Sequence, residues 1–167
     1  MCYSARNPKI QSSFTSIGKE DSLLLHLLSD FDLKGETNPL LIQLIASLLN
    51  SESIRKVIYR TNKLQPLVSR LQTALVLKAK QWQLVNEILR VLVTLTFYPD
   101  GNDELYNKVK VIDLLCDLST RPEITESPLF NIFMNNLKGH QKTWIGLKGA
   151  INRDDEGLPD RLNKWLS

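Results

Sequence analysis

Two stretches of the chain carry the same pattern of apolar residues at a constant spacing of 47 positions. The spacing relates Ile42 to Leu89, and farther along it relates Tyr59 to Tyr106. The other matching pairs are Ile45 and Leu92, Leu48 and Leu95, Ile58 and Leu105, Leu64 and Val111, Leu67 and Leu114, Val68 and Leu115, and Leu71 and Leu118. A repeat in the forties with helical spacing predicts a solenoid of stacked helical units. Such folds present long surfaces to partners, so the repeat favours binding over catalysis.

The apolar spacing and the turn residues divide each unit into a short, a medium and a long helix. Asn38 and Pro39 suit the cap and the first turn of the helix that follows them. Pro99-Asp-Gly101 predicts a turn, and Gly139 predicts the end of a helix. Helices are expected over residues 21–33, 39–49, 53–60, 65–80, 81–97, 102–108, 111–118, 127–137, 144–151 and 158–165, with the end of the fourth left open.

The length and composition describe an ordinary globular chain. Its 167 residues predict one domain, with residues 1–20 as a flexible lead-in and residues 21–167 as the helical repeat domain. We expect no membrane contact, because no apolar run approaches the roughly 18 residues that span a bilayer. The two cysteines, Cys2 and Cys116, form no motif, which fits a reducing, cytoplasmic setting.

Two short motifs resemble the armadillo family. Leu64-Gln-Pro-Leu-Val68 resembles the opening of the family's second helix, and Asn136-Leu137 resembles the close of its third helix. The fold class predicted is therefore all-α, a right-handed α-solenoid of about three armadillo/HEAT-like repeats. The resemblance implies a groove along the long helices, where an Asn and a Trp of each repeat bind the backbone of an extended peptide.

The positions that correspond to this Asn and Trp are the candidate partner-binding residues. The Asn positions hold Ser47, Thr94 and Asn136, and the Trp positions hold Gln43, Arg90 and Ile132. Only Asn136 keeps the family residue. The predicted site consists of Gln43, Ser47, Glu87, Arg90, Thr94 and Asn136, with Glu87 one turn before Arg90. These side chains are expected to bind a peptide or helix of a partner protein, with Arg90 pairing with a carboxylate.

A narrower resemblance covers the C-terminal half. Leu89-Arg-Val-Leu-Val-Thr-Leu-Thr-Phe97, Asp100-Gly-Asn102 and Lys110-Val-Ile112 resemble the last armadillo units of rotatin and the insect anastral spindle proteins, and Phe133-Met-Asn-Asn-Leu137 continues the match. Those proteins are large components of centrioles and basal bodies. The resemblance implies a scaffold in centriole assembly, a centriolar protein partner and a location at the centrosome.

Residues that would indicate catalysis are few. His26 and His140 have no nearby nucleophile, and the cysteines and histidines do not cluster as a metal site would require. No phosphate-binding or dinucleotide-binding motif is present. We therefore expect no enzyme activity, no metal and no cofactor.

The charges are arranged in blocks. Residues 53–86 contain no Asp or Glu, whereas Asp and Glu dominate residues 100–126. The cations of the first block are Arg55, Lys56, Arg60, Lys63, Arg70, Lys78 and Lys80. This Arg55–Lys80 block offers an alternative function, the binding of nucleic acid through phosphate contacts. A third interpretation is a purely structural segment of a longer solenoid.

Overall fold

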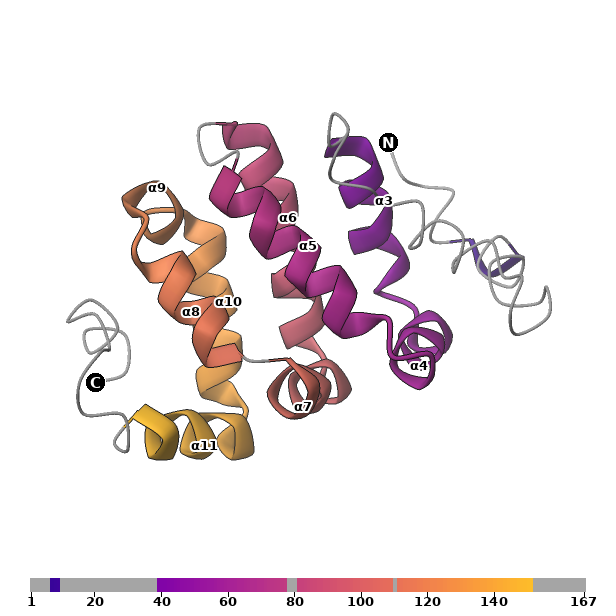
Figure 1. The fold of residues 1–167 in the computed structure, drawn as a ribbon. Coiled ribbons are helices and arrows are strands. Elements are labelled where there is room, and N and C mark those ends of the chain that lie inside the picture. Colours follow the sequence, from indigo (N-terminus) through magenta and orange to yellow (C-terminus); the bar gives the residue numbers. More distant parts are fainter. Residues whose placement is uncertain (1–6, 10–38, 78–80, 110, 152–167) are drawn as a thin grey trace.

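The computed structural model describes residues 7–9, 39–77, 81–109 and 111–151 (Figure 1). The regular elements longer than two residues within these ranges are all helices. They are α3 (Pro39–Leu48), α4 (Glu52–Arg60), α5 (Leu64–Leu77), α6 (Trp82–Phe97), α7 (Pro99–Lys108), α8 (Val111–Ser119), α9 (Pro122–Thr125), α10 (Pro128–Gly139) and α11 (Gln141–Ile151). The predicted all-α solenoid is confirmed. The helices expected over 21–33 and 158–165, and nearly all of the lead-in, lie outside the described residues.

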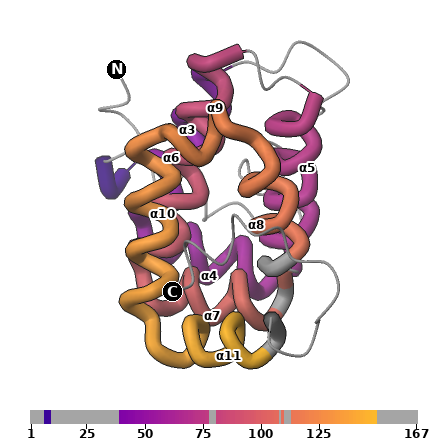
Figure 2. The backbone as a smooth tube through the Cα atoms, turned by 90° about the vertical axis from the view of Figure 1, so that its left-hand side faces the viewer, coloured from indigo at the N-terminus to yellow at the C-terminus, as the bar shows by residue number. Residues whose placement is uncertain are grey.

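The helices stack in three layers that run along the solenoid (Figure 2). Helices α3, α6 and α10 occupy the predicted long positions and lie side by side in one layer, the long-helix layer. Helices α5 and α8, at the predicted medium positions, form the second layer, and α4, α7 and α11, at the short positions, form the third. The lengths themselves depart from the prediction, because α8 has 9 residues and α7 has 10. A single unit cannot bury its apolar face alone, so stacking of successive units produces the continuous core.

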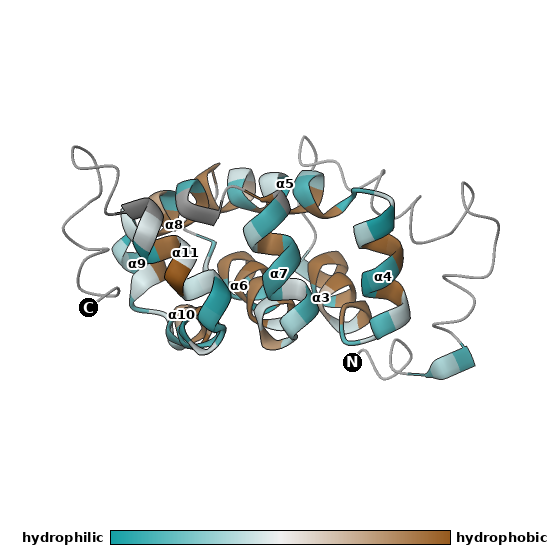
Figure 3. Cartoon of the chain, turned by 90° about the horizontal axis from the view of Figure 1, so that it is seen from below, coloured by the Kyte–Doolittle hydropathy of each residue, from teal (hydrophilic) through white to brown (hydrophobic). Residues whose placement is uncertain are grey.

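Helix α6 lies at the centre of the stack, because α3 and α10 both pack against it. Its buried side chains, which form a broad stripe along one side, are Leu84, Val85, Ile88, Leu89, Val91, Leu92, Leu95 and Thr96. Phe130 and Phe133 of α10 complete the core on the C-terminal side, with ring centroids 6.2 Å apart. In Figure 3 the hydrophobic residues lie mostly on the sides of the helices that face their neighbours.

The repeat also appears in the polar contacts that join a short helix to the long helix before it. Arg55 Nη1 donates to the backbone carbonyl of Leu49 at 2.9 Å. Asn102 Nδ2 donates to the carbonyl of Thr96 in the same way. Both donors and both acceptors are related by the 47-residue spacing. Each contact supplies a partner for a carbonyl near the end of a long helix, where the helix itself provides none.

A second repeated contact packs the short helices against each other. Tyr59 and Tyr106 are equivalent in successive units, and each approaches a glycine of the next short helix. A Cβ atom added to Gly146 would lie 2.1 Å from Tyr106 Oη. A Cβ atom added to Gly101 would lie 3.2 Å from Tyr59 Oη and only 2.0 Å from the carbonyl oxygen of Leu95. These two positions therefore require glycine for close helix packing.

Two local predictions differ from the structure. The predicted turn at Pro99-Asp-Gly101 is instead the first turn of α7, because proline at the first helical position is preorganised for a helix. The short helix α9 was not predicted, and it too begins with a proline, Pro122. A turn at Thr61 and Asn62 separates α4 from α5, with Asn62 at φ 54°.

Candidate functional site

The six predicted partner-binding residues lie on the three adjacent helices of the long-helix layer. Gln43 and Ser47 belong to α3, Glu87, Arg90 and Thr94 belong to α6, and Asn136 belongs to α10. Spacings of three and four residues place the members of one helix on a common face. That face is opposite to the buried stripe of α6, and we call this surface the long-helix face. The structure thus brings the six positions onto one surface, whose role in binding stays a prediction.

The hydroxyl groups of this face bond to their own helices. Ser47 Oγ donates to the carbonyl of Gln43 at 2.9 Å, and Thr94 Oγ1 donates to the carbonyl of Arg90 at 2.8 Å. Because a hydroxyl carries two acceptor lone pairs in addition to its proton, both oxygens retain the capacity to accept a hydrogen bond from a bound chain.

Asn136 makes a contact that the sequence did not indicate. Its amide nitrogen donates to the carbonyl of Val93 and to Thr96 Oγ1, each at 3.3 Å. Both acceptors belong to α6, so the amide connects two successive long helices. The amide nitrogen of Asn136 is therefore engaged in inter-repeat packing, which leaves its carbonyl oxygen as the group that can bind a partner.

Glu87 and Arg90 form an ion pair along α6. Arg90 Nε lies 3.5 Å from Glu87 Oε1. The side chain of Glu87 is only 14% exposed, whereas that of Arg90 is largely exposed. Since Arg90 uses Nε for this pair, its terminal nitrogens remain at the surface. Arg90 can thus accept a carboxylate from a partner in a charge-assisted contact.

Large apolar side chains are exposed close to these polar groups. Phe97, three residues after Thr94, is 69% exposed, and Ile132, four residues before Asn136, is also exposed. Leu40 is exposed one turn before Gln43. Each of these apolar side chains lies one helical turn from a polar residue of the long-helix face, and apolar surface rimmed by polar residues is typical of protein-binding sites. The sequence signal for Ile132 was its place at a family Trp position; no comparable signal marked Phe97.

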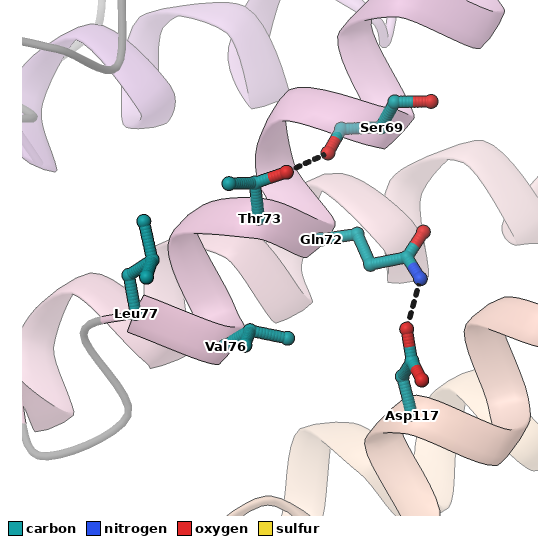
Figure 4. A pocket seen from close by; sticks show the side chains of 6 residues that line it. All are labelled: Ser69, Gln72, Thr73, Val76, Leu77 and Asp117. Atoms are coloured by element: carbon teal, nitrogen blue, oxygen red, sulfur yellow. Dashed lines mark hydrogen bonds between the residues drawn. The ribbon is translucent and has the colours of Figure 1, made fainter.

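A shallow depression of about 330 Å³ lies in the medium-helix layer, away from the long-helix face (Figure 4). It is lined by Ser69, Gln72, Thr73, Val76, Leu77 and Asp117. Gln72 of α5 hydrogen-bonds to Asp117 of α8, and Thr73 Oγ1 bonds to the carbonyl of Ser69 at 2.9 Å. These residues include no pair of nucleophile and base, so the depression offers no catalytic arrangement.

The prediction that Arg55 belongs to a phosphate-binding face is wrong. Its side chain is only 6% exposed, and its Nε donates to Asp100 Oδ2 at 3.0 Å. Its guanidinium carbon also lies 3.7 Å from the centroid of the Tyr98 ring. The neighbouring Lys56 pairs with Glu52, and the hydrogen bond from Lys56 lowers the pKa of Glu52. The cationic block is therefore partly buried and partly neutralised.

Two further observations on the described residues concern other kinds of site. Over those ranges, His, Cys, Asp and Glu side chains form no group of three or more that suits a metal ion. None of the helices described here combines the length and the apolar character that crossing a bilayer demands.

Comparison with known families identifies the type of repeat. Residues 5–124 match the family model that describes the H subunit of the V-ATPase, a match that covers well over half of the chain. The chain belongs to the V-ATPase H-subunit family. This family is an all-helical, armadillo/HEAT-like solenoid, in agreement with the three layers described above. Its members are regulatory and non-catalytic, and they bind protein partners.

The armadillo part of the predicted resemblance therefore agrees with the V-ATPase H-subunit family, whereas nothing in the comparisons supports the resemblance to rotatin. No curated protein and no solved structure matched the chain.

Proposed function

We propose that this chain is a non-catalytic scaffold of the V-ATPase H-subunit type that holds a segment of a partner protein on its long-helix face. The observation that carries the proposal is the exposure of Phe97 on α6 and of Ile132 on α10, on the same face of the long-helix layer as the largely exposed Arg90. Apolar anchors with a nearby arginine are the residue types that supply most binding energy at protein interfaces. The family adds independent support, because its members act through protein contacts.

The side chains of the long-helix face indicate which kind of partner segment it can bind. The hydroxyl oxygens of Ser47 and Thr94 accept hydrogen bonds from backbone N–H groups, and Arg90 pairs with a carboxylate. Phe97 and Ile132 favour one or two apolar side chains in the same segment. A partner peptide or helix with apolar residues and one acid fits this combination.

We take a protein of a V-ATPase assembly as the expected partner, and the match to the V-ATPase H-subunit family supports this choice. A centriolar partner is the second candidate, and it rests only on the residues that resemble rotatin. A cytoplasmic location is compatible with both and stays a prediction.

The test compares partner capture by two double variants that have similar chemistry on different faces. Arg90→Ala with Ile132→Asp changes the long-helix face, and Arg60→Ala with Val76→Asp changes exposed residues of the other two layers. Proximity labelling in cells should lose one dominant protein partner only with the first variant. Circular dichroism and size-exclusion chromatography verify that both variants fold.

The identity of the lost partner separates the candidates. Loss of V-ATPase proteins supports the family-based assignment, and loss of centriolar proteins supports the second candidate. Equal partner lists for the two variants would show that the long-helix face is not the interface. If the captured partners disappeared after nuclease treatment, the result would support the alternative function, nucleic-acid binding through the Arg55–Lys80 block. The burial of Arg55 disfavours that function.

A purely structural role makes a different prediction. A segment that only continues a longer solenoid has apolar ends that associate when the chain is isolated. Analytical ultracentrifugation of the purified chain distinguishes the two roles, because a monodisperse monomer at high concentration agrees with a scaffold that binds through its side.

A further inference from the structure

A second surface combines an aromatic ring with two cations at the C-terminal end of the described helices. Trp144 of α11 is half-buried, and two lysines lie over its ring. Lys138 Nζ is 5.5 Å from the ring centroid and Lys148 Nζ is 5.4 Å from it. Both lysines are exposed, so two ammonium groups at the surface share the face of one indole or its two faces.

The outward side of α11 continues this surface. Gln141, Trp144, Ile145 and Lys148 follow the i, i+3, i+4, i+7 spacing of a single helix face. Ile145 is 62% exposed, although it is a large apolar residue. The opposite side of α11 packs inward, with Leu147 buried and Gly146 against Tyr106. We call Lys138, Trp144, Ile145 and Lys148 the α11 patch.

The α11 patch carries positive charge that the described part of the fold does not neutralise. Residues 127–151 contain Lys138, Lys142 and Lys148 but no Asp or Glu. Lys142 is paired with Asp103 of α7 at 3.3 Å. Among the described residues, Lys138 and Lys148 contact only the ring of Trp144 through their ammonium groups. Such cation–π contacts are weak at exposed sites, so both ammonium groups can exchange them for an ion pair with a carboxylate.

We propose that the α11 patch is a docking site for an acidic segment of a partner protein. Two carboxylates of the segment pair with Lys138 and Lys148, and an apolar side chain between them packs on Trp144 and Ile145. An acidic segment is chosen because its negative charge complements the two lysines. Tryptophan is enriched among the residues that dominate binding energy at protein interfaces.

The surroundings of the α11 patch favour a short acidic segment over an extended polyanion. Asp103, an acidic residue of the adjoining helix α7, pairs with Lys142 of α11. A membrane surface or a nucleic acid would extend past the patch toward this carboxylate. A lysine near an anionic membrane adds only a modest electrostatic attraction, so these two lysines are too few for stable membrane attachment.

Three residues of the α11 patch, Trp144, Ile145 and Lys148, belong to α11 in the short-helix layer (Figure 2), and Lys138 lies near the end of α10. None of the six residues of the predicted partner-binding site belongs to the patch, so the α11 inference does not depend on the function proposed above.

The experiment measures binding of a defined probe to the full chain. The probe is a short fluorescein-labelled peptide with two glutamates flanking leucine, and its control has glutamine in place of both glutamates. Lys138→Glu with Lys148→Glu reverses the patch, while Lys56→Glu with Arg60→Glu makes the same charge change on exposed residues of α4. All four residues are exposed, so each variant is expected to fold.

Fluorescence anisotropy should show glutamate-dependent binding that falls at least tenfold in the patch variant and stays unchanged in the α4 variant. A peptide with lysine in place of both glutamates should bind the patch variant better than it binds the wild type. The indole N–H resonance of Trp144 should shift only with the glutamate peptide.

Three results would overturn the proposal. The first is equal binding of the glutamate and glutamine peptides by the wild type. The second is equal binding of the glutamate peptide by the patch variant and the α4 variant. The third is patch-dependent binding of phosphatidylserine vesicles or single-stranded DNA that is tighter than binding of the peptide. The last result would assign the α11 patch to a membrane or to nucleic acid instead.

Discussion

Arg55 of α4 donates from Nε to Asp100 of α7 at 3.0 Å, and this ion pair joins the short helices of two successive units. The same guanidinium stacks on Tyr98 and reaches the carbonyl of Leu49 through Nη1. Arg55 therefore connects α4 to the end of α3, to the residue between α6 and α7, and to α7 itself. One buried cation serves as a junction of the repeat array.

Replacing Arg55 by alanine should lower the free energy of unfolding by about 2–3 kcal/mol. The substitution removes two charge-assisted hydrogen bonds and leaves the Leu49 carbonyl without this donor. Asp100 is 38% exposed and can be hydrated, which limits the loss. Urea unfolding measures the effect, and Arg60→Ala on the exposed side of α4 is the control, with an expected change within about 0.5 kcal/mol. Equal effects at the two positions would contradict the junction role.

Alanine in place of Gly101 or Gly146 should destabilise the protein, although helix propensity alone predicts a gain of about 1 kcal/mol for each. The added Cβ would meet the Leu95 carbonyl oxygen at the first position and the Tyr106 ring at the second. Gly101→Ala should cost more, because backbone yields less readily than a side chain, and losses of about 1–3 kcal/mol are typical of overpacking. Thermal unfolding compares both with Gly139→Ala, whose Cβ meets nothing within 4 Å. A higher melting temperature for Gly146→Ala would refute the packing account.

Asn136→Ala should reduce the free energy of unfolding by about 1 kcal/mol, because it removes the amide donor that links α10 to α6. Asn135→Ala, at the adjacent exposed position, is the control and should be nearly neutral. Chemical denaturation distinguishes the two. If Asn136→Ala instead left stability unchanged and weakened partner binding, its main role would be on the long-helix face.

The folded protein should lose stability above about pH 10, in part through Tyr59. Burial raises the pKa of Tyr59 above its ordinary value, so the folded state favours the neutral phenol. A raised folded-state pKa contributes stability that is fully present below the unfolded pKa of about 10 and is lost as pH rises toward the folded pKa. Urea unfolding across this range should show a shallower decline for Tyr59→Phe than for the wild type. Parallel declines would indicate that other groups control alkaline unfolding.

The sequence predicted the long-helix face correctly as a set of neighbours, because the 47-residue spacing makes Ser47 and Thr94 equivalent positions of stacked helices. It did not predict how the polar groups of that face are used. Asn136 was expected to meet a partner, yet its amide donates to α6. The spacing of Asn136 gives the side of α10 on which it lies, but the acceptor of its hydrogen bond belongs to α6 of the preceding unit.

The charge pattern was a weaker guide than the apolar pattern. Arg55 looked like a member of an exposed cationic block, because charged residues are rarely fully buried without a partner. Its partners, Tyr98 and Asp100, are more than forty positions away in sequence. The turn expected at Pro99–Gly101 failed for a local reason, since proline starts helices as readily as it ends them.

The sequence by itself determined the class of fold, the division of each unit into three main helices, and the residues that form the core. These features follow from the periodicity of apolar residues within single helices, which is a local property. The tertiary structure alone decided that Arg55 is buried, that Asn136 ties α10 to α6, and that Gly146 accommodates Tyr106. Each of these contacts joins neighbouring units, so it depends on how closely and at what angle the helices pack.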